Sequence, residues 1–332
     1  MVKGSGKLFI TGPAVIKGVT GEVVTDEELG GAMAHALNSG NIHFVAENDQ
    51  HAIEITKQLL SYLPQNNTEN PPSYGDGSIQ LMEYPDLNTI VPDDPKEAYN
   101  MFEVINRVVD PGSVLEVKQF WATNIITCFA RINGETIGII ANQPCVKAGC
   151  LDIDASDKSS EFIRFCNAFN IPIVTFVDVP GFLPGVQQEF GGIIRHGAKM
   201  LFAYSAATVP KVTIVVRKAY GGAYLAMCAK SLGADRSAAW PTAEIAVMGA
   251  EGAVAVLYAK EIKEAKDPVA RKKELIEEYQ ERWSSPYPAA EFGLVDAVIE
   301  PIKTREYISV CLQTLKNKRE LRPAKKHGLI PM

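Results

Sequence analysis

The chain has 332 residues, 46% of them hydrophobic and 22% charged, which is the balance of a globular protein and excludes wholesale disorder. This length allows one and a half to two domains, and the net charge of −6 argues against a general nucleic-acid binder. Because the sequence shows neither a signal peptide nor an unbroken apolar run of about 18 residues, we expect a cytoplasmic protein.

Residues 1–64 contain too little regular structure to bury a core of their own. A strand is predicted at 7–11, and a capping box formed by Thr25 and Glu28 marks the start of a helix. A second helix is predicted at 48–63. We therefore expect residues 1–64 to be the tail of a larger domain, or a domain that a partner completes.

Residues 65–95 are polar and rich in proline, so we predict a linker there and a domain boundary. The alternative is a long surface loop of a single domain. On the first interpretation, the second domain comprises residues 96–332.

Strands and helices alternate in the second domain, which predicts an α/β fold with largely parallel strands. Asn133 and Gly134 form the strongest short hairpin signal in the chain. The predicted strands are 113–120, 123–132, 136–141, 171–178, 211–217 and 236–240, and the predicted helices are 95–109, 156–170, 188–205, 220–231 and 252–282.

Two glycine-rich loops, 178–185 and 217–224, each follow a predicted strand and precede a predicted helix. Such a loop presents free backbone N–H groups at the positive end of the helix dipole, and glycine lets a ligand approach the backbone closely. The two loops could each supply N–H groups to an oxyanion. The alternative is a pair of tight strand–helix turns with no ligand. Neither loop has the spacing of a Walker or a Rossmann fingerprint.

Other candidate sites carry weaker signals. His196 could act as a base, but a role in helix packing is the favoured interpretation. Asp152, Asp154 and Asp157 resemble a calcium loop only loosely, because the required Gly and Glu positions differ. No CxxC pair is present, and we predict no metal site.

The end of the chain is basic. A solvated or packed tail is the favoured interpretation, and binding of a phosphate or a partner is the alternative. The basic residues are Lys316, Lys318, Arg319, Arg322, Lys325 and Lys326.

Several long stretches make the chain resemble the carboxyltransferase subunits of biotin-dependent acyl-CoA enzymes. This family includes propionyl-CoA carboxylase beta chains, the large subunit of methylmalonyl-CoA transcarboxylase and the decarboxylase subunit of methylmalonyl-CoA decarboxylase. The resemblance covers essentially the whole chain and is carried by residues 9–13, 152–158, 178–185, 217–224 and 239–249.

The resemblance implies a crotonase-like (ClpP/crotonase) fold, an α/β spiral of β-β-α units. The family has two such domains, so the chain is expected to hold one complete domain, 96–332, and the carboxy-terminal remnant of another, 1–64. It also implies a homo-oligomer, a hexamer in the full-length family, whose active site lies between domains of two subunits.

The implied reaction moves a carboxyl group between carboxybiotin and propionyl-CoA or methylmalonyl-CoA. Biotin is carried by a separate biotin carboxyl carrier protein, and the acyl group is a coenzyme A thioester. The N–H groups of Gly222 and Ala223 match the oxyanion hole that stabilises the biotin ureido oxygen, with Gly181 and Phe182 as weaker candidates.

Tyr224 and Leu225 are expected to contact the substrate, and an apolar Leu225 favours a small aliphatic acyl group. Two alternatives remain. The chain could be the decarboxylase subunit of a methylmalonyl-CoA decarboxylase complex, or a catalytically silent fragment that only assembles.

Overall fold

The structure is a computed structural model that describes residues 1–80, 82–324 and 328–331. The regular secondary structure within residues 1–64 is helical, and the prediction of a strand at 7–11 is wrong. Lys7 forms only a single bridge with Gly31, so no neighbouring strand completes a ladder there. The predicted helix after Thr25 is broken at Gly31. The helices are α1 (Pro13–Thr20), α2 (Asp26–Gly30), α3 (Ala32–Asn38) and α4 (Asp49–Leu60).

A mixed sheet forms the centre of the molecule, with the strand order β1-β2-β3-β4-β5-β6-β8, and β7 pairs with the end of β5. Strands β1 to β3 are antiparallel, and the pairs from β3 onward are parallel. This confirms the predicted α/β class. The strands are β1 (Leu115–Glu116), β2 (Ile125–Ile132), β3 (Glu135–Asn142), β4 (Ile173–Val179), β5 (Lys211–Tyr220), β6 (Arg236–Ala239), β7 (Glu244–Ala246) and β8 (Ala297–Val298).

The hairpin predicted at Asn133–Gly134 is confirmed. Both residues have positive φ, +53° and +76°, as the two-residue turn between β2 and β3 requires. The turn sets the register, in which Ile132 faces Glu135 and Ile125 faces Asn142.

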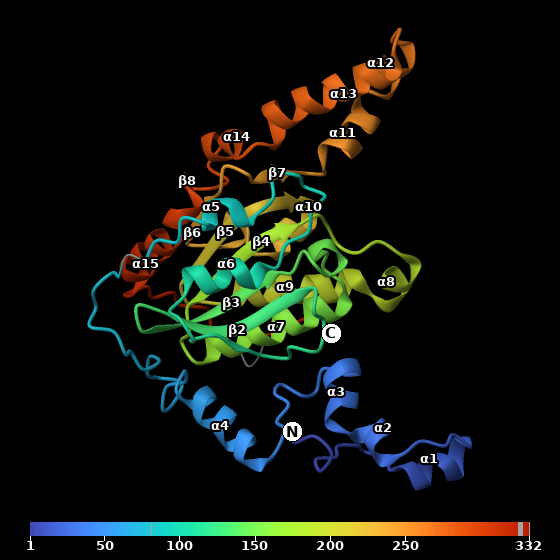
Figure 1. Cartoon of the computed structure of the whole chain (residues 1–332), viewed down its shortest axis with the longest axis vertical. Coiled ribbons are helices and arrows are strands. Elements are labelled where there is room, and N and C mark those ends of the chain that lie inside the picture. Colours follow the sequence, from blue (N-terminus) through green and yellow to red (C-terminus); the bar gives the residue numbers. More distant parts are fainter. Residues whose placement is uncertain (81, 325–327, 332) are drawn as a thin grey trace.

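Helices cover both faces of the sheet (Figure 1). Helices α7 (Ile153–Ala168) and α9 (Ile193–Ala206) pack on one apolar cluster, while α6 (Met101–Val108) and α15 (Thr304–Leu315) pack on the other. Neighbouring residues of one strand enter different clusters, as Ile139 and Ile140 do, because side chains alternate across a strand. The sheet strands are therefore buried on both sides.

The predicted helix 188–205 is divided into α8 (Val186–Gly191) and α9 at Gly192, whose φ is +94°. The segment predicted as a linker contains α5 (Leu87–Ile90), whose Leu87 is buried. The helix predicted at 95–109 begins only at Met101, after an Asn100 cap.

The helix predicted at 252–282 is also broken, and its pieces form an arm that projects from the sheet (Figure 1). The arm consists of α11 (Ala250–Leu257), α12 (Ala259–Glu264), α13 (Pro268–Tyr279), a π-helical turn (Gln280–Ser284) and α14 (Pro286–Glu291). Its breaks lie at Tyr258, which leaves the helical conformation, and before Pro268, which starts a new helix behind its Asp267 cap.

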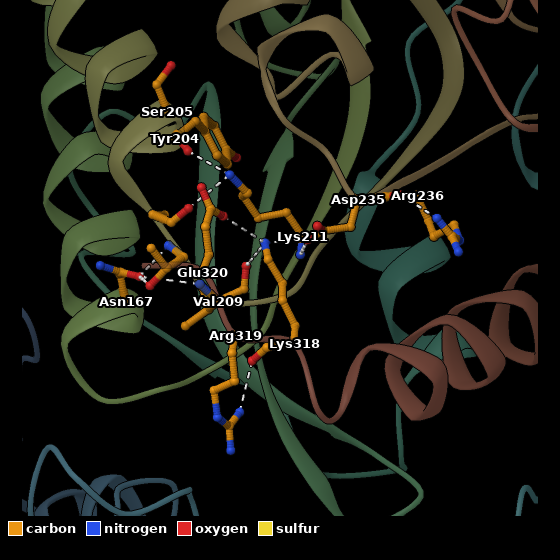
Figure 2. Close-up of polar contacts among 12 residues, drawn as sticks. Asn167, Tyr204, Ser205, Val209, Lys211, Asp235, Arg236, Lys318, Arg319 and Glu320 are labelled. Atoms are coloured by element: carbon orange, nitrogen blue, oxygen red, sulfur yellow. Dashed lines mark hydrogen bonds and ion pairs between the residues drawn. The ribbon is translucent and has the colours of Figure 1, made fainter. Parts of the chain in front are cut away.

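The basic tail packs against the body of the protein (Figure 2). The Lys318 ammonium donates to Val209 O at 3.1 Å and pairs with Asp235 at 2.9 Å, while Arg322 donates to Ser205 O. This supports the packed interpretation for that part of the tail, whereas Lys325 and Lys326 lie outside the described residues.

Candidate functional site

The two glycine-rich segments leave neighbouring parallel strands at the same edge of the sheet. Val179 at the end of β4 pairs with Ala219 near the end of β5, so the segments begin within a few residues of a shared strand pair. Adjacent strands lie about 4.8 Å apart. The second segment is shorter than predicted, because β5 continues to Tyr220 and pairs there with β7.

Helix α10 (Gly221–Ala226) begins directly at the end of β5. Gly221 has φ of +55°, and a Cβ there would lie 2.8 Å from Val247 O, so the turn requires glycine. The N-cap residue Tyr220 makes no side-chain cap bond. The first N–H groups of a helix have no partner within it, so Gly222 and Ala223 can offer theirs to a ligand.

Gly222 lies beside open space. Apart from its two chain neighbours and the backbone of its own helix, no atom of the described residues lies within 4 Å of the position that a Cβ on Gly222 would take. Ala223 is almost completely buried, and its methyl group belongs to the core. At the start of α10 the backbone of Gly222 is therefore accessible, while the buried side chain of Ala223 holds the helix against the core.

A parallel β-bridge joins Phe182 of the first glycine-rich segment to Leu151, just before α7. Leu151 N donates to Gly181 O at 3.1 Å, and Leu183 N donates to Leu151 O at 2.7 Å. In such a parallel bridge the flanking residues make the bonds, so the N–H of Phe182 is not used by it. The Phe182 ring instead packs against Gly197 of α9, where a Cβ would lie 2.9 Å from the ring.

Tyr224 and Leu225 both line a pocket beside α10 with a volume of about 680 Å³. The Leu225 side chain is partly exposed, whereas Tyr224 is buried. This burial raises the pKa of the Tyr224 phenol to about 12. The opposite side comes from the arm, which the sequence analysis did not connect with the site. The lining residues from the arm are Leu257, Tyr258, Tyr279 and Trp283.

A second missed feature holds the strand ends in place. Tyr220 donates a hydrogen bond from its hydroxyl to Glu244 on β7, and burial together with this bond raises the pKa of Tyr220. Asp178 and Arg217 form a buried ion pair between β4 and β5. Both residues stand inside the glycine-rich motifs, but sequence spacing does not show that their side chains meet.

His196 is explained by packing between α7 and α9. Its Nδ1 lies 2.9 Å from the Asp157 carboxylate, which also pairs with Lys199 at 2.6 Å. Asp152 caps α7 by accepting a bond from Ala155 N at 2.9 Å. Within the described residues no group of three or more His, Cys, Asp or Glu side chains could hold a metal ion.

No helix in the described ranges 1–80, 82–324 and 328–331 is long and apolar enough to cross a membrane.

Comparison with known proteins matches residues 1–330 to the carboxyl transferase domain. The chain is 57% identical over 332 residues to the alpha subunit of methylmalonyl-CoA decarboxylase from Propionigenium modestum. It is 61% identical over 324 residues to the 12S subunit of methylmalonyl-CoA carboxyltransferase from Propionibacterium freudenreichii subsp. shermanii. These alignments cover 100% and 98% of this chain but 64% and 62% of the relatives.

Solved structures give the same result. The chain matches transcarboxylase 12S, described as a hexamer with methylmalonyl-coenzyme A and methylmalonic acid bound, with a TM-score of 0.97 at 60% identity. That match covers all of this chain and 64% of the other. The beta subunit of geranyl-CoA carboxylase from P. aeruginosa matches with a TM-score of 0.64 at 30% identity, over 99% of this chain and 61% of the other. The fold and the resemblance expected from the sequence are confirmed, and the chain belongs to the carboxyl transferase domain family.

Proposed function

We propose that the protein containing this chain is a biotin-dependent acyl-CoA carboxyltransferase that acts on propionyl-CoA or methylmalonyl-CoA. The observation that carries the proposal is the uncapped start of α10 beside open space, in a chain whose relatives at 61% and 54% identity are a methylmalonyl-CoA carboxyltransferase and a propionyl-CoA carboxylase subunit. On this proposal, residues 96–332 form the complete carboxy-terminal domain and residues 1–64 the end of the amino-terminal one, with 65–95 as linker.

The residues around α10 fit the biotin ring. The accessible backbone at Gly222 lets a flat ring approach, and the neighbouring pocket is mainly apolar. When bound, carboxylated biotin supplies the carboxyl group and its ureido oxygen becomes negatively charged. The N–H groups of Gly222 and Ala223 would stabilise this oxygen, with Gly181 and Phe182 on the neighbouring loop as further donors.

The proposal places the substrate contacts on the pocket wall. Tyr224 and Leu225 would face the acyl group of the coenzyme A thioester, since both line the pocket that begins at Gly221. Because the proposal places oxyanion stabilisation on backbone groups, this stabilisation requires no side chain of the chain itself. A biotin carboxyl carrier protein and a homo-oligomer complete the proposal, and the cytoplasmic location stays a prediction.

Gly222→Pro removes one of the proposed donors. In the complete protein we expect kcat for carboxyl transfer to fall about 10²–10³-fold, the usual cost of losing one oxyanion donor. Lys260→Pro is the matched control, because Lys260 is also the second residue of a six-residue helix and its side chain is exposed. Full activity of Gly222→Pro would refute the assigned role.

The second candidate is the decarboxylase subunit of a methylmalonyl-CoA decarboxylase complex. It is favoured by relatives with that name from Propionigenium modestum and Veillonella parvula, at 57% and 58% identity. Product analysis of the native complex distinguishes the two, since a decarboxylase releases the carboxyl group as carbon dioxide and a transferase passes it to an acceptor. A silent fragment is the remaining candidate for the isolated chain, and measurable turnover by that chain would exclude it.

A further inference from the structure

Arg217 lies near the end of β5, four residues before Gly221, and is buried with only 4% of its surface exposed. Its Nε donates to Asp178 Oδ2 at 3.1 Å, and Asp178 is 1% exposed. A buried charge is costly unless it is paired and hydrogen-bonded. The hydrogen bonds of these two side chains therefore identify the backbone segments that the pair connects.

Asp178 connects three strands. Its Oδ1 accepts a bond from Lys218 N on β5 at 3.0 Å, and its own N–H donates to Asn142 Oδ1 on β3 at 3.1 Å. The register between β4 and β5 shifts at this point, from Val177 opposite Val215 to Val179 opposite Ala219. The carboxylate satisfies a backbone N–H of β5 where this irregularity interrupts the ladder.

The other end of Arg217 reaches the segment before α6. Its Nη1 donates to Glu97 O at 2.8 Å and to Asp94 O at 3.2 Å, while Lys218 Nζ donates to Pro95 O. Lys96 in the same segment pairs with Glu251 of α11 at 3.2 Å, so the segment also contacts the arm that lines the pocket.

We propose that Arg217 is a positioning residue for carboxyl transfer, which braces the end of β5 between Asp178 and residues 94–97 and so fixes the backbone donors of α10. The proposal rests on the proposed function of Gly222 and Ala223. A guanidinium suits this role because its planar fork holds several acceptors in fixed directions, whereas a lysine ammonium is a single flexible point of charge. Arg217 itself touches no reacting atom on this proposal.

The test uses the complete protein, with wild type, Arg217→Met and Arg217→Lys assayed for carboxyl transfer well below the unfolding temperature. Arg305→Met is the matched control. Arg305 is 2% exposed, pairs with Asp110 at 2.6 Å and donates to Val108 O and Gln80 O, so it is an equally buried brace on α15. We expect kcat to fall at least tenfold in Arg217→Met and about threefold in Arg217→Lys, with KM nearly unchanged, while folded Arg305→Met keeps the wild-type kcat.

Hydrogen exchange gives a readout that does not depend on activity. Amide exchange in residues 219–224 should accelerate at least tenfold in both Arg217 variants and stay at the wild-type rate in Arg305→Met. If Arg217→Met does not fold, Arg217→Lys and Asp178→Asn decide by the same two measurements. Wild-type kcat together with unchanged exchange at 219–224 in these variants would overturn the positioning role, whereas an inactive wild-type protein would overturn the proposed function instead.

Discussion

At the scale of single residues, the sequence located the backbone turn but not the side chains that hold it. Gly221 and Gly222 could be identified because glycine marks a turn directly in the sequence. The pairing of Asp178 with Arg217 could not, because it depends on the register of β4 against β5, which is irregular at that point. Trp283 was missed because it reaches the pocket from a π-helical turn about 60 residues away in sequence.

Leu225→Ala should widen the acyl side of the pocket. In the complete protein we expect the ratio of kcat/KM for butyryl-CoA to that for propionyl-CoA to rise about tenfold, since one methylene in an apolar pocket is worth roughly 1–3 kcal/mol. Leu321→Ala, at a side chain that is 97% exposed, should leave this ratio unchanged. An unchanged ratio in Leu225→Ala would remove Leu225 from the acyl site.

At the scale of elements, turns and helix caps could be predicted from the sequence, whereas the positions at which helices break could not. The hairpin at 133–134 is confirmed because its two turn residues determine the geometry locally. The prediction of a strand at 7–11 is wrong because a strand needs a neighbouring strand to share a ladder of hydrogen bonds. The helix predicted at 188–205 is divided because Gly192 has a positive φ. Helix α7 depends on tertiary contacts as well, most clearly at the buried Lys158.

Lys158 is 1% exposed, and its ammonium donates to Trp121 O at 2.8 Å and Ile125 O at 2.9 Å. Burial lowers its pKa to about 8, while a free lysine titrates near 10.5. Between these values the unfolded chain binds more protons than the folded one, so this group makes stability rise with pH from about 8 to 10.5 and leaves the folded state least favoured below pH 8.

Urea unfolding of Lys158→Met at pH 7 and pH 9.5 checks this account. We expect the variant to lose more stability at pH 9.5 than at pH 7, because only the wild type gains stability as the buried ammonium loses its proton, while two buried carbonyls lack their donor in the variant at both pH values. The part of the pH dependence that comes from Lys158 should disappear as well. Lys260→Met, at an exposed lysine, should follow the wild type at both pH values. Identical pH slopes in wild type and Lys158→Met would contradict the role of burial.

Lys318→Ala should release the tail. The Lys318 side chain is 13% exposed, and its ammonium lies between Asp235, Glu320 and Val209 O. We therefore expect a loss of about 1–3 kcal/mol of unfolding free energy and earlier proteolysis after residue 316. Lys316→Ala is the control, because its pair with Glu135 spans 3.6 Å at the surface and contributes little. Equal stability of the two variants would mean that the packed tail contributes nothing.

At the scale of the whole molecule, the chain spans about 64% of the length of the relatives that it matches. Its exposed apolar side chains include Val15 and Val19 on α1 and Val256 and Trp283 on the arm. The sequence predicted the family because its motifs are long and contiguous. The shared surfaces and partner subunits that the proposal invokes involve groups outside this chain, so they could not be located from its sequence.

The most direct test of the proposed function follows a labelled carboxyl group from methylmalonyl-CoA to biotin with the complete protein. We predict that label appears on biotin, that propionyl-CoA forms in equal amount, and that both products require biotin. Formation of propionyl-CoA at the same rate without biotin, or the absence of any transfer by the folded protein, would contradict the proposal.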